Sequence, residues 1–341
     1  MDRPRVAIAA RAETMPMRAI GLAVVVVAAW GTTWAPATHA AQACDRWNTE
    51  GFFAAASAGD VAACLAAGAS VDVRTASGGT PLHTAAAVTS DATVVEALLD
   101  GDALVNARDG NGWTPLHVAA AVANFEIAGV LIAAGANIDE AATNGGTPLH
   151  AAANNSADPN VIMLLVEAGA SLDVQMSSGW TPLHSAASYN TEPAIVDALV
   201  AAGAIVDVRD QSGWAPIHWA AGANSNPAIA EALIAGGADV DTLDPRYWTP
   251  LHWAAGNNPN PAMIEALVRA GADLEARSAR GSTPLHAAAR TSKNPAVVEA
   301  LLDQGADPDA TTMAGSSAAD IASNNEALAG TDVLRRLQGG G

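Results

Sequence analysis

The stretch TPLHSAASYNTEPAIVDALVAAGAIVDVRDQSGW, residues 181–214, contains the features that decide the fold. Its first four residues recur along the chain every 33 or 34 residues, and a variant, Ala215-Pro216-Ile217-His218, fills the one missing place. A fixed period of this length indicates a repeat protein, in which each unit buries its apolar face against its neighbours. The complete copies of Thr-Pro-Leu-His begin at Thr80, Thr114, Thr147, Thr181, Thr249 and Thr283.

Each unit carries the local signals of two helices. Thr181 is a typical N-cap, and Pro182 stands at the first helical position, where its missing N–H costs nothing. A second helix follows, with apolar residues such as Ile195 and Leu199 at helical spacing, and it stops at Gly203. An extended piece and a turn then lead to the next unit. The pattern predicts an all-α fold of stacked helix pairs.

A Thr-Pro-Leu-His helix start, a Gly-Ala stop and an Asp-x-x-Gly turn at this period resemble the ankyrin repeat, over roughly residues 50–337. The resemblance implies an ankyrin-repeat solenoid of about seven full repeats, with hairpin turns along one edge and degenerate capping units at both ends. The expected divisions are a signal peptide at 1–43, an N-terminal capping unit at 44–79, ankyrin repeats at 80–313, and a C-terminal capping unit and tail at 314–341.

Two residues depart from the pattern in turns where other units have glycine. Asp102 stands where a second helix ends, so this turn is expected to be less stable. Tyr247 replaces the glycine of a hairpin turn, and a tyrosine with positive φ is costly. We therefore expect the hairpin at Tyr247 to be either remodelled or strained.

Four arginines share one position before the hairpin turn: Arg74, Arg108, Arg209 and Arg277. Acidic residues follow two of them, at Asp109 and Asp210. This neighbourhood favours ion pairs within the hairpins over a stripe of arginines that bind a ligand.

The first 43 residues have the organisation of a secretory signal of the exported bacterial type. Arginines at positions 3, 5, 11 and 18 precede an uncharged apolar run, 19–34, and small residues follow it. Cleavage after Ala40 or Ala43 would deliver a periplasmic or secreted protein with no remaining segment that inserts into a membrane. Three alternatives stay open: an uncleaved membrane anchor, a lipid-modified Cys44, and a start at Met15 or Met17.

Two cysteines, Cys44 and Cys64, follow the signal. In an exported chain two cysteines suggest one disulfide, whereas in the cytosol they would be free buried thiols. The predicted disulfide would tie the mature N-terminus to the first helical pair.

Composition limits the classes of partner. Half of the 341 residues are hydrophobic but only 4% are aromatic, so Ala, Val, Leu and Ile must form the core. The formal net charge is −19, with 16 Lys and Arg against 35 Asp and Glu. Because phosphate contacts need clustered Lys and Arg, this balance excludes nucleic-acid binding. It favours a partner protein with a basic surface and disfavours anionic membranes.

The histidines are not expected to carry chemistry. Seven of the eight are the fourth residue of the repeat motif. Equivalent atoms of stacked repeats lie about 8–10 Å apart, too far to share a metal ion. We expect each histidine to bond within its own motif turn or to the neighbouring repeat, which leaves none for a catalytic pair. With no glycine-rich phosphate loop either, the sequence predicts no metal, no cofactor and no catalytic residues.

The tryptophans are the candidate partner-binding residues. Four occupy the hairpin position before the helix cap, which faces the partner in ankyrin-like proteins, and two follow their histidines on the first helices. Trp and Tyr supply large contact areas at low entropic cost. The competing interpretation is that each ring only packs on the neighbouring hairpin. The candidates are Trp113, Trp180, Trp214, Trp248, Trp219, Trp253 and Tyr247.

The sequence therefore predicts a non-catalytic protein-interaction scaffold, periplasmic or secreted, that binds its partner on the concave, hairpin-lined face. Two alternatives remain. One is a secreted effector that binds a host protein. The other is a carbohydrate-binding or enzymatic solenoid that uses the ladder of tryptophans against sugar rings.

Overall fold

The computed structural model describes residues 44–339 and confirms the all-α prediction within them. The elements are helices joined by turns, with one isolated β-bridge between Thr311 and Ser317. The proposed signal peptide, 1–43, lies outside the described residues, as do the last two residues of the C-terminal tail.

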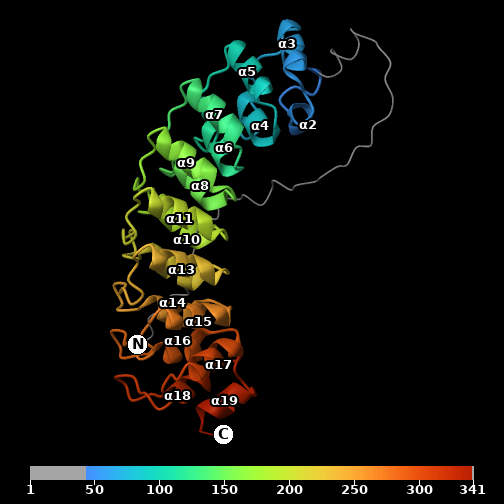
Figure 1. Cartoon of the computed structure of the whole chain (residues 1–341). Coiled ribbons are helices and arrows are strands. Elements are labelled where there is room, and N and C mark those ends of the chain that lie inside the picture. The colour runs from blue at the N-terminus through green and yellow to red at the C-terminus, as the bar shows by residue number, and fades with distance from the viewer. Residues whose placement is uncertain (1–43, 340–341) are drawn as a thin grey trace, which may run out of the picture. The chain divides into compact units, whose positions relative to one another are not determined.

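Seven central helix pairs follow one another along the chain, and a shorter pair precedes and follows them (Figure 1). The first helices of the central pairs are α4 (Pro81–Val88), α6 (Pro115–Ala121), α8 (Pro148–Asn155), α10 (Pro182–Tyr189), α12 (Pro216–Ala223), α14 (Pro250–Asn257) and α16 (Pro284–Thr291). The second helices are α5 (Ala92–Asp100), α7 (Phe125–Ala133), α9 (Pro159–Glu167), α11 (Pro193–Ala201), α13 (Pro227–Ala235), α15 (Pro261–Arg269) and α17 (Pro295–Asp303). The terminal pairs are α2 (Glu50–Phe53) with α3 (Ala58–Ala66), and α18 (Ala318–Ala322) with α19 (Asp332–Leu337).

The first helices begin where the motif predicts. Thr181 has extended dihedral angles (φ −90°, ψ 169°), and Pro182 is the first residue of α10. The second helix of the same unit begins at Pro193, and its last turn leads to Gly203, whose φ is +101°. Only glycine adopts this conformation at little cost, so the chain reverses there towards the hairpin.

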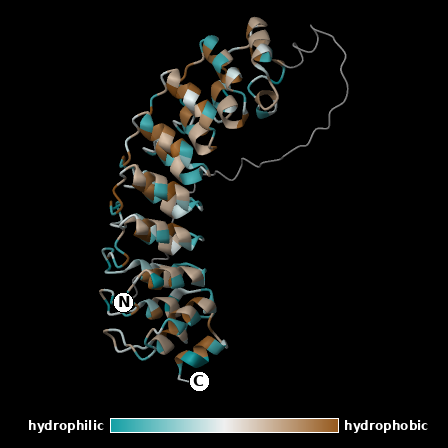
Figure 2. Cartoon of the chain, viewed as in Figure 1, coloured by the Kyte–Doolittle hydropathy of each residue, from teal (hydrophilic) through white to brown (hydrophobic). Residues whose placement is uncertain are grey.

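The helices form two layers. First helices pack on first helices of the neighbouring units, as α10 does on α8 and α12, and second helices do the same. Small side chains allow this close stacking. Ala186 and Ala187 of α10 are completely buried, as are Leu183 in the same helix and Ile195 and Leu199 in α11. Figure 2 shows hydrophobic residues recurring in every pair.

The N-terminal pair is held by the predicted disulfide, which is confirmed: Cys44 and Cys64 are bonded, with their Cα atoms 5.4 Å apart. Aromatic side chains also pack together in this N-terminal pair. The rings of Trp47 and Phe52 are 5.4 Å apart, and those of Phe52 and Phe53 are 4.9 Å apart. This small pair therefore has both a covalent link and an aromatic core.

Both irregular turns place a residue other than glycine at positive φ. Asp102 has a φ of +67° and Tyr247 a φ of +61°. The hairpin at Tyr247 keeps the same closing hydrogen bond as other hairpins, from the Tyr247 N–H to the Asp244 carbonyl at 2.9 Å. The turn is thus strained rather than remodelled.

Of the ion pairs predicted for the hairpin arginines, one forms among the described residues, and it does not involve the neighbouring aspartate. The guanidinium of Arg209 donates to the carbonyls of Gly213 and Leu243, at 3.1 and 2.9 Å, and so joins its own hairpin to the next. Arg108 instead forms an ion pair with Glu140 of the following unit. Asp210 is occupied by N–H donors of its own turn, which satisfy its carboxylate without an arginine.

Candidate partner-binding surface

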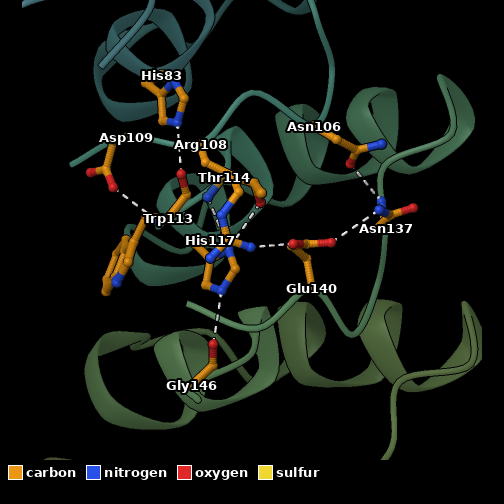
Figure 3. Close-up of polar contacts among 10 residues, drawn as sticks. All are labelled: His83, Asn106, Arg108, Asp109, Trp113, Thr114, His117, Asn137, Glu140 and Gly146. Atoms are coloured by element: carbon orange, nitrogen blue, oxygen red, sulfur yellow. Dashed lines mark hydrogen bonds and ion pairs between the residues drawn. The ribbon is translucent and has the colours of Figure 1, made fainter. Parts of the chain in front are cut away.

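Each repeat histidine joins its own helix cap to the next hairpin. In the second central unit, the Thr114 N–H donates to Nδ1 of His117 at 3.1 Å, and Nε2 of the same ring bonds the Gly146 carbonyl at 3.1 Å (Figure 3). The accepting carbonyl belongs to the residue before the next N-cap in all seven units, at Nε2–O distances of 2.9 to 3.3 Å. This is the position that carries the hairpin tryptophans.

The hydrogen bonds determine the tautomer of these histidines. Because a backbone N–H can only donate, Nδ1 is the acceptor, and the proton lies on Nε2. Burial lowers the pKa of His117, His150 and His218 to about 4. The rings are therefore neutral at neutral pH, and both nitrogens are engaged in holding the backbone.

The hairpin tryptophans stand on this support. Trp180 lies over His184 of its own motif, with ring centroids 6.3 Å apart, and Trp214 and Trp248 lie over their histidines at 6.4 and 5.6 Å. The backbone of each tryptophan is held from the preceding unit, since its carbonyl accepts the histidine Nε2–H from there.

These tryptophans belong to a continuous line of rings, which we call the aromatic row. Successive centroids along it are 5.6, 4.6, 4.7, 3.9 and 5.0 Å apart. Rings at such distances pack directly against one another. In order, the aromatic row consists of Tyr189, Trp180, Trp219, Trp214, Trp253 and Trp248.

Two buried aspartates fasten the row to the hairpins. The carboxylate of Asp210 accepts the indole N–H of Trp219 at 2.9 Å, and that of Asp244 accepts the indole N–H of Trp253 at 3.2 Å. Each also accepts backbone N–H groups of its turn, including that of Trp214 or Trp248. One carboxylate thus fixes a tryptophan on a helix and a tryptophan on a hairpin.

Sequence reasoning missed the role of these aspartates and also missed Tyr189. The available signal was a spacing: both aspartates precede their helix tryptophan by nine residues. Asp109, at the same hairpin position, has Val118 in place of the tryptophan and caps only its turn. Tyr189 offered no comparable signal, because its contact with Trp180 depends on how α10 faces its hairpin.

Small residues make room for the row. A Cβ at Gly222 would lie 3.5 Å from the Cβ of Trp253, and a Cβ at Gly256 would lie 3.8 Å from Cζ3 of Trp248 and only 3.0 Å from Oγ1 of Thr291. Glycine at these two helical positions therefore allows the rings to rest on the helix backbone.

The row offers a surface of uneven exposure. Trp253 is only 2% exposed, so it supports its neighbours and has almost no surface for a partner. Trp180, Trp214 and Trp248 are half-buried, and their indole N–H groups have no acceptor within residues 44–339 while keeping access to solvent. These three residues can give a partner both ring contacts and hydrogen bonds.

The remaining candidates lie apart from the row. Trp113 stacks on His117 at 5.6 Å, but Gly146 occupies the hairpin position in the next unit, so the line of rings is interrupted there. Tyr247 is 57% exposed at its hairpin turn. Beside it, the guanidinium of Arg246 lies 5.9 Å from the ring centroid of Trp253.

Two searches of the described residues concern metal ions and membrane spans. Between residues 44 and 339, no group of three or more His, Cys, Asp or Glu side chains is arranged to hold a metal ion. Within the same range, every helix is too short or too polar to cross a lipid bilayer.

Comparison with known proteins agrees with this geometry. A family model described as ankyrin repeats (3 copies) matches residues 52–142, 130–210, 149–244 and 217–312. Among solved structures, the chain is similar to the human ASB11 ankyrin repeat domain, with 29% sequence identity and a TM-score of 0.58. That similarity covers 67% of this chain and 98% of the human one. None of the curated proteins matches the chain.

Proposed function

Because the chain belongs to the ankyrin-repeat family, whose repeats generally mediate protein–protein interactions, we propose that it is a non-catalytic scaffold that binds another protein through the aromatic row. The observation that carries this proposal is the continuity of the row. Six rings from three successive hairpins and first helices form one continuous line, in which the buried Trp253 supports the partly exposed rings on either side. Isolated tryptophans would be enough if these rings only stabilised the stack.

The geometry explains how such a surface would bind. Histidine bonds hold the backbone of Trp180, Trp214 and Trp248, and aspartate bonds hold the indoles of Trp219 and Trp253 against which these rings pack. The rings are thus positioned before a partner arrives, so little side-chain entropy is lost on binding. Rigid Trp and Tyr rings are the residues most enriched among those that dominate binding energy. All seven repeat histidines use both ring nitrogens in structural hydrogen bonds, which supports a binding role over a catalytic one.

We further propose that the protein acts after export, in the periplasm or outside the cell, on a partner whose overall surface is basic. The signal-like N-terminus supports export, and the Cys44–Cys64 bond suits an oxidising compartment. The net charge of −19 attracts basic proteins at long range. Cell fractionation followed by N-terminal sequencing of the mature protein tests this part. The expected result is a new N-terminus at Ala41 or at Cys44.

The experiment that tests the binding surface compares Trp214→Ala with Trp113→Ala. Both residues are hairpin tryptophans that stack on their own histidines, but only Trp214 belongs to the row. A partner is first captured from the exported fraction with the native protein, and its affinity for both variants is then measured. Thermal unfolding of each variant verifies that it is folded.

We expect Trp214→Ala to weaken binding about thirtyfold or more, as the loss of a central hot-spot residue does, and Trp113→Ala to weaken it less than about threefold. Equal effects of the two substitutions would mean that the row only packs. If no protein is captured, and the native protein binds immobilised polysaccharides while Trp214→Ala does not, the result would instead favour a carbohydrate-binding function.

A further inference from the structure

A hollow lies where the aromatic row stops. In the unit that follows Trp248 and Trp253, the same two positions hold the small residues Ser282 and Ala287. Beside Ser282 there is a hollow of about 490 Å³, within the size range of small-ligand sites. Its lining includes Arg280, Arg290, Ser282, Thr312, Met313 and Ser316.

The hollow carries positive charge in an acidic protein. Arg280 lies at the hairpin turn before α16, and Arg290 lies in the last turn of that helix. Both side chains are exposed, and neither forms an ion pair within the part of the chain that the structure describes. Two uncompensated guanidinium groups thus line one concavity of a chain with only 16 Lys and Arg residues.

The lining of the hollow includes no Asp or Glu residue that would offset this charge. His286 is neutral in its structural role, because its Nδ1 accepts the Thr283 N–H and its Nε2 bonds the Ser316 carbonyl. The guanidinium of Arg277 does not line the hollow and donates to the carbonyls of Gly281 and Thr311. The hydroxyls of the lining residues add donors that suit an anion.

We propose that this hollow binds a carboxylate of the partner, carried by a segment whose apolar residues lie on the adjoining aromatic row. A planar guanidinium matches the two oxygens of a carboxylate, and such charge-assisted bonds are about twice as strong as neutral ones. The inference rests on the proposed function of the row and adds to it the chemistry and the direction of the bound segment.

This local preference is compatible with a partner of basic overall charge. Electrostatic interactions are screened over about 8 Å at physiological ionic strength. The net charge of the whole chain therefore acts on the approaching partner, whereas Arg280 and Arg290 act on the group that enters the hollow. One acidic group in a basic or neutral partner would fix the register of the segment along the row.

The test uses the full mature protein and a synthetic library of random 12-residue peptides, made once with free C-termini and once amidated. The library is selected on the native protein, on Trp214→Ala, on the double variant Arg280→Glu with Arg290→Glu, and on a matched control. The control, Arg269→Glu with Lys293→Glu, changes the net charge equally at exposed residues outside the hollow. Thermal unfolding checks that all variants are folded.

Native protein is expected to enrich Asp or Glu about tenfold at one position, at a fixed distance from apolar residues. The control should keep this preference, and the Arg280→Glu, Arg290→Glu variant should replace it with Lys or Arg. Acidic enrichment in both library forms identifies a side-chain carboxylate, whereas enrichment limited to free C-termini identifies the terminal carboxylate.

Two results overturn the inference alone. One is selection that depends on Trp214 but shows no acidic preference. The other is an acidic preference that survives the charge reversal at Arg280 and Arg290. If the native protein selects no more peptides than Trp214→Ala, the proposed function fails, and the inference fails with it.

Discussion

Tyr247 has an unfavourable backbone conformation for a residue with a side chain. Its φ of +61° is a conformation that the equivalent Gly213 and Gly281 adopt, at +78° and +70°, without a Cβ penalty. The side chain is 57% exposed, so packing does not explain the tyrosine. Strained residues concentrate at functional sites, and Tyr247 stands directly before Trp248 of the aromatic row.

Replacing Tyr247 by glycine is expected to raise the free energy of unfolding by about 1 kcal/mol, because it relieves the positive φ. Tyr247→Ala removes the ring but keeps the Cβ, so it should leave the strain in place. Urea unfolding of both variants separates the two effects. Equal stabilities of the alanine and glycine variants would contradict the idea of backbone strain at this residue.

The polar residues of the candidate surface could be predicted only in part. The tryptophans of the row were identified because their positions repeat with the motif. The aspartates that hold them, and the burial of Trp253, depend on side-chain directions between hairpin and helix, which a linear pattern does not give. Two hairpin arginines, Arg209 and Arg277, were misassigned for the same reason: they donate to carbonyls of the next unit.

Among the elements, the N-terminal pair differs most from the others. Its helices α2 and α3 span four and nine residues and have a neighbouring pair on one side only. In a repeat protein each unit depends on its nearest neighbours, so a terminal unit lacks half of its stabilising contacts. The Cys44–Cys64 bond compensates by closing a loop with a sequence separation of 20.

Replacing both cysteines by alanine is therefore expected to cost this pair about 3 kcal/mol, as for a disulfide that closes a loop of similar length. Hydrogen exchange followed by mass spectrometry measures where the loss falls. We expect faster exchange in α2 and α3 and unchanged exchange from α10 to α15. An equal change in all units would instead mean that the chain unfolds as one cooperative body.

Helix pairs were predictable because their signals are local. A threonine cap, a proline at the first helical position and a glycine after the second helix determine the beginning and end of each helix without reference to the rest of the chain. The disulfide could be predicted because only two cysteines follow the proposed signal, which leaves one possible pairing within the chain. The hollow at Arg280 and Arg290 could not be predicted, because its lining comes from two successive hairpins and from α16 and α18, which a linear pattern does not bring together.

At the scale of the whole molecule, the seven repeat histidines make stability depend on pH. Burial lowers the pKa of all of them below the value of about 6.5 expected in the unfolded chain, to about 4 for three of them. The pKa of the other four is lowered as well. The seven histidines are His83, His117, His150, His184, His218, His252 and His286. Protonation would also remove the Nδ1 acceptor of each helix cap.

The unfolded state consequently binds more protons than the folded state between about pH 6.5 and pH 4. The contribution of the histidines to stability is complete above this window, is lost as the pH falls through it, and levels off once the folded histidines protonate as well. Each histidine contributes a slope of at most about 1.4 kcal/mol per pH unit. Acid also reduces the net negative charge, which acts in the opposite direction by weakening self-repulsion.

The two effects can be separated with His117→Gln, which removes one buried titrating ring and leaves the chain's carboxylates unchanged. Between pH 6.5 and pH 4.5, its unfolding free energy should fall less steeply than that of the native protein, by up to about 1.4 kcal/mol per pH unit. Urea unfolding at several pH values measures both slopes. Parallel curves would show that His117 is protonated in the folded protein at the same pH as in the unfolded one, and the coupling between helix caps and acid stability would then be wrong.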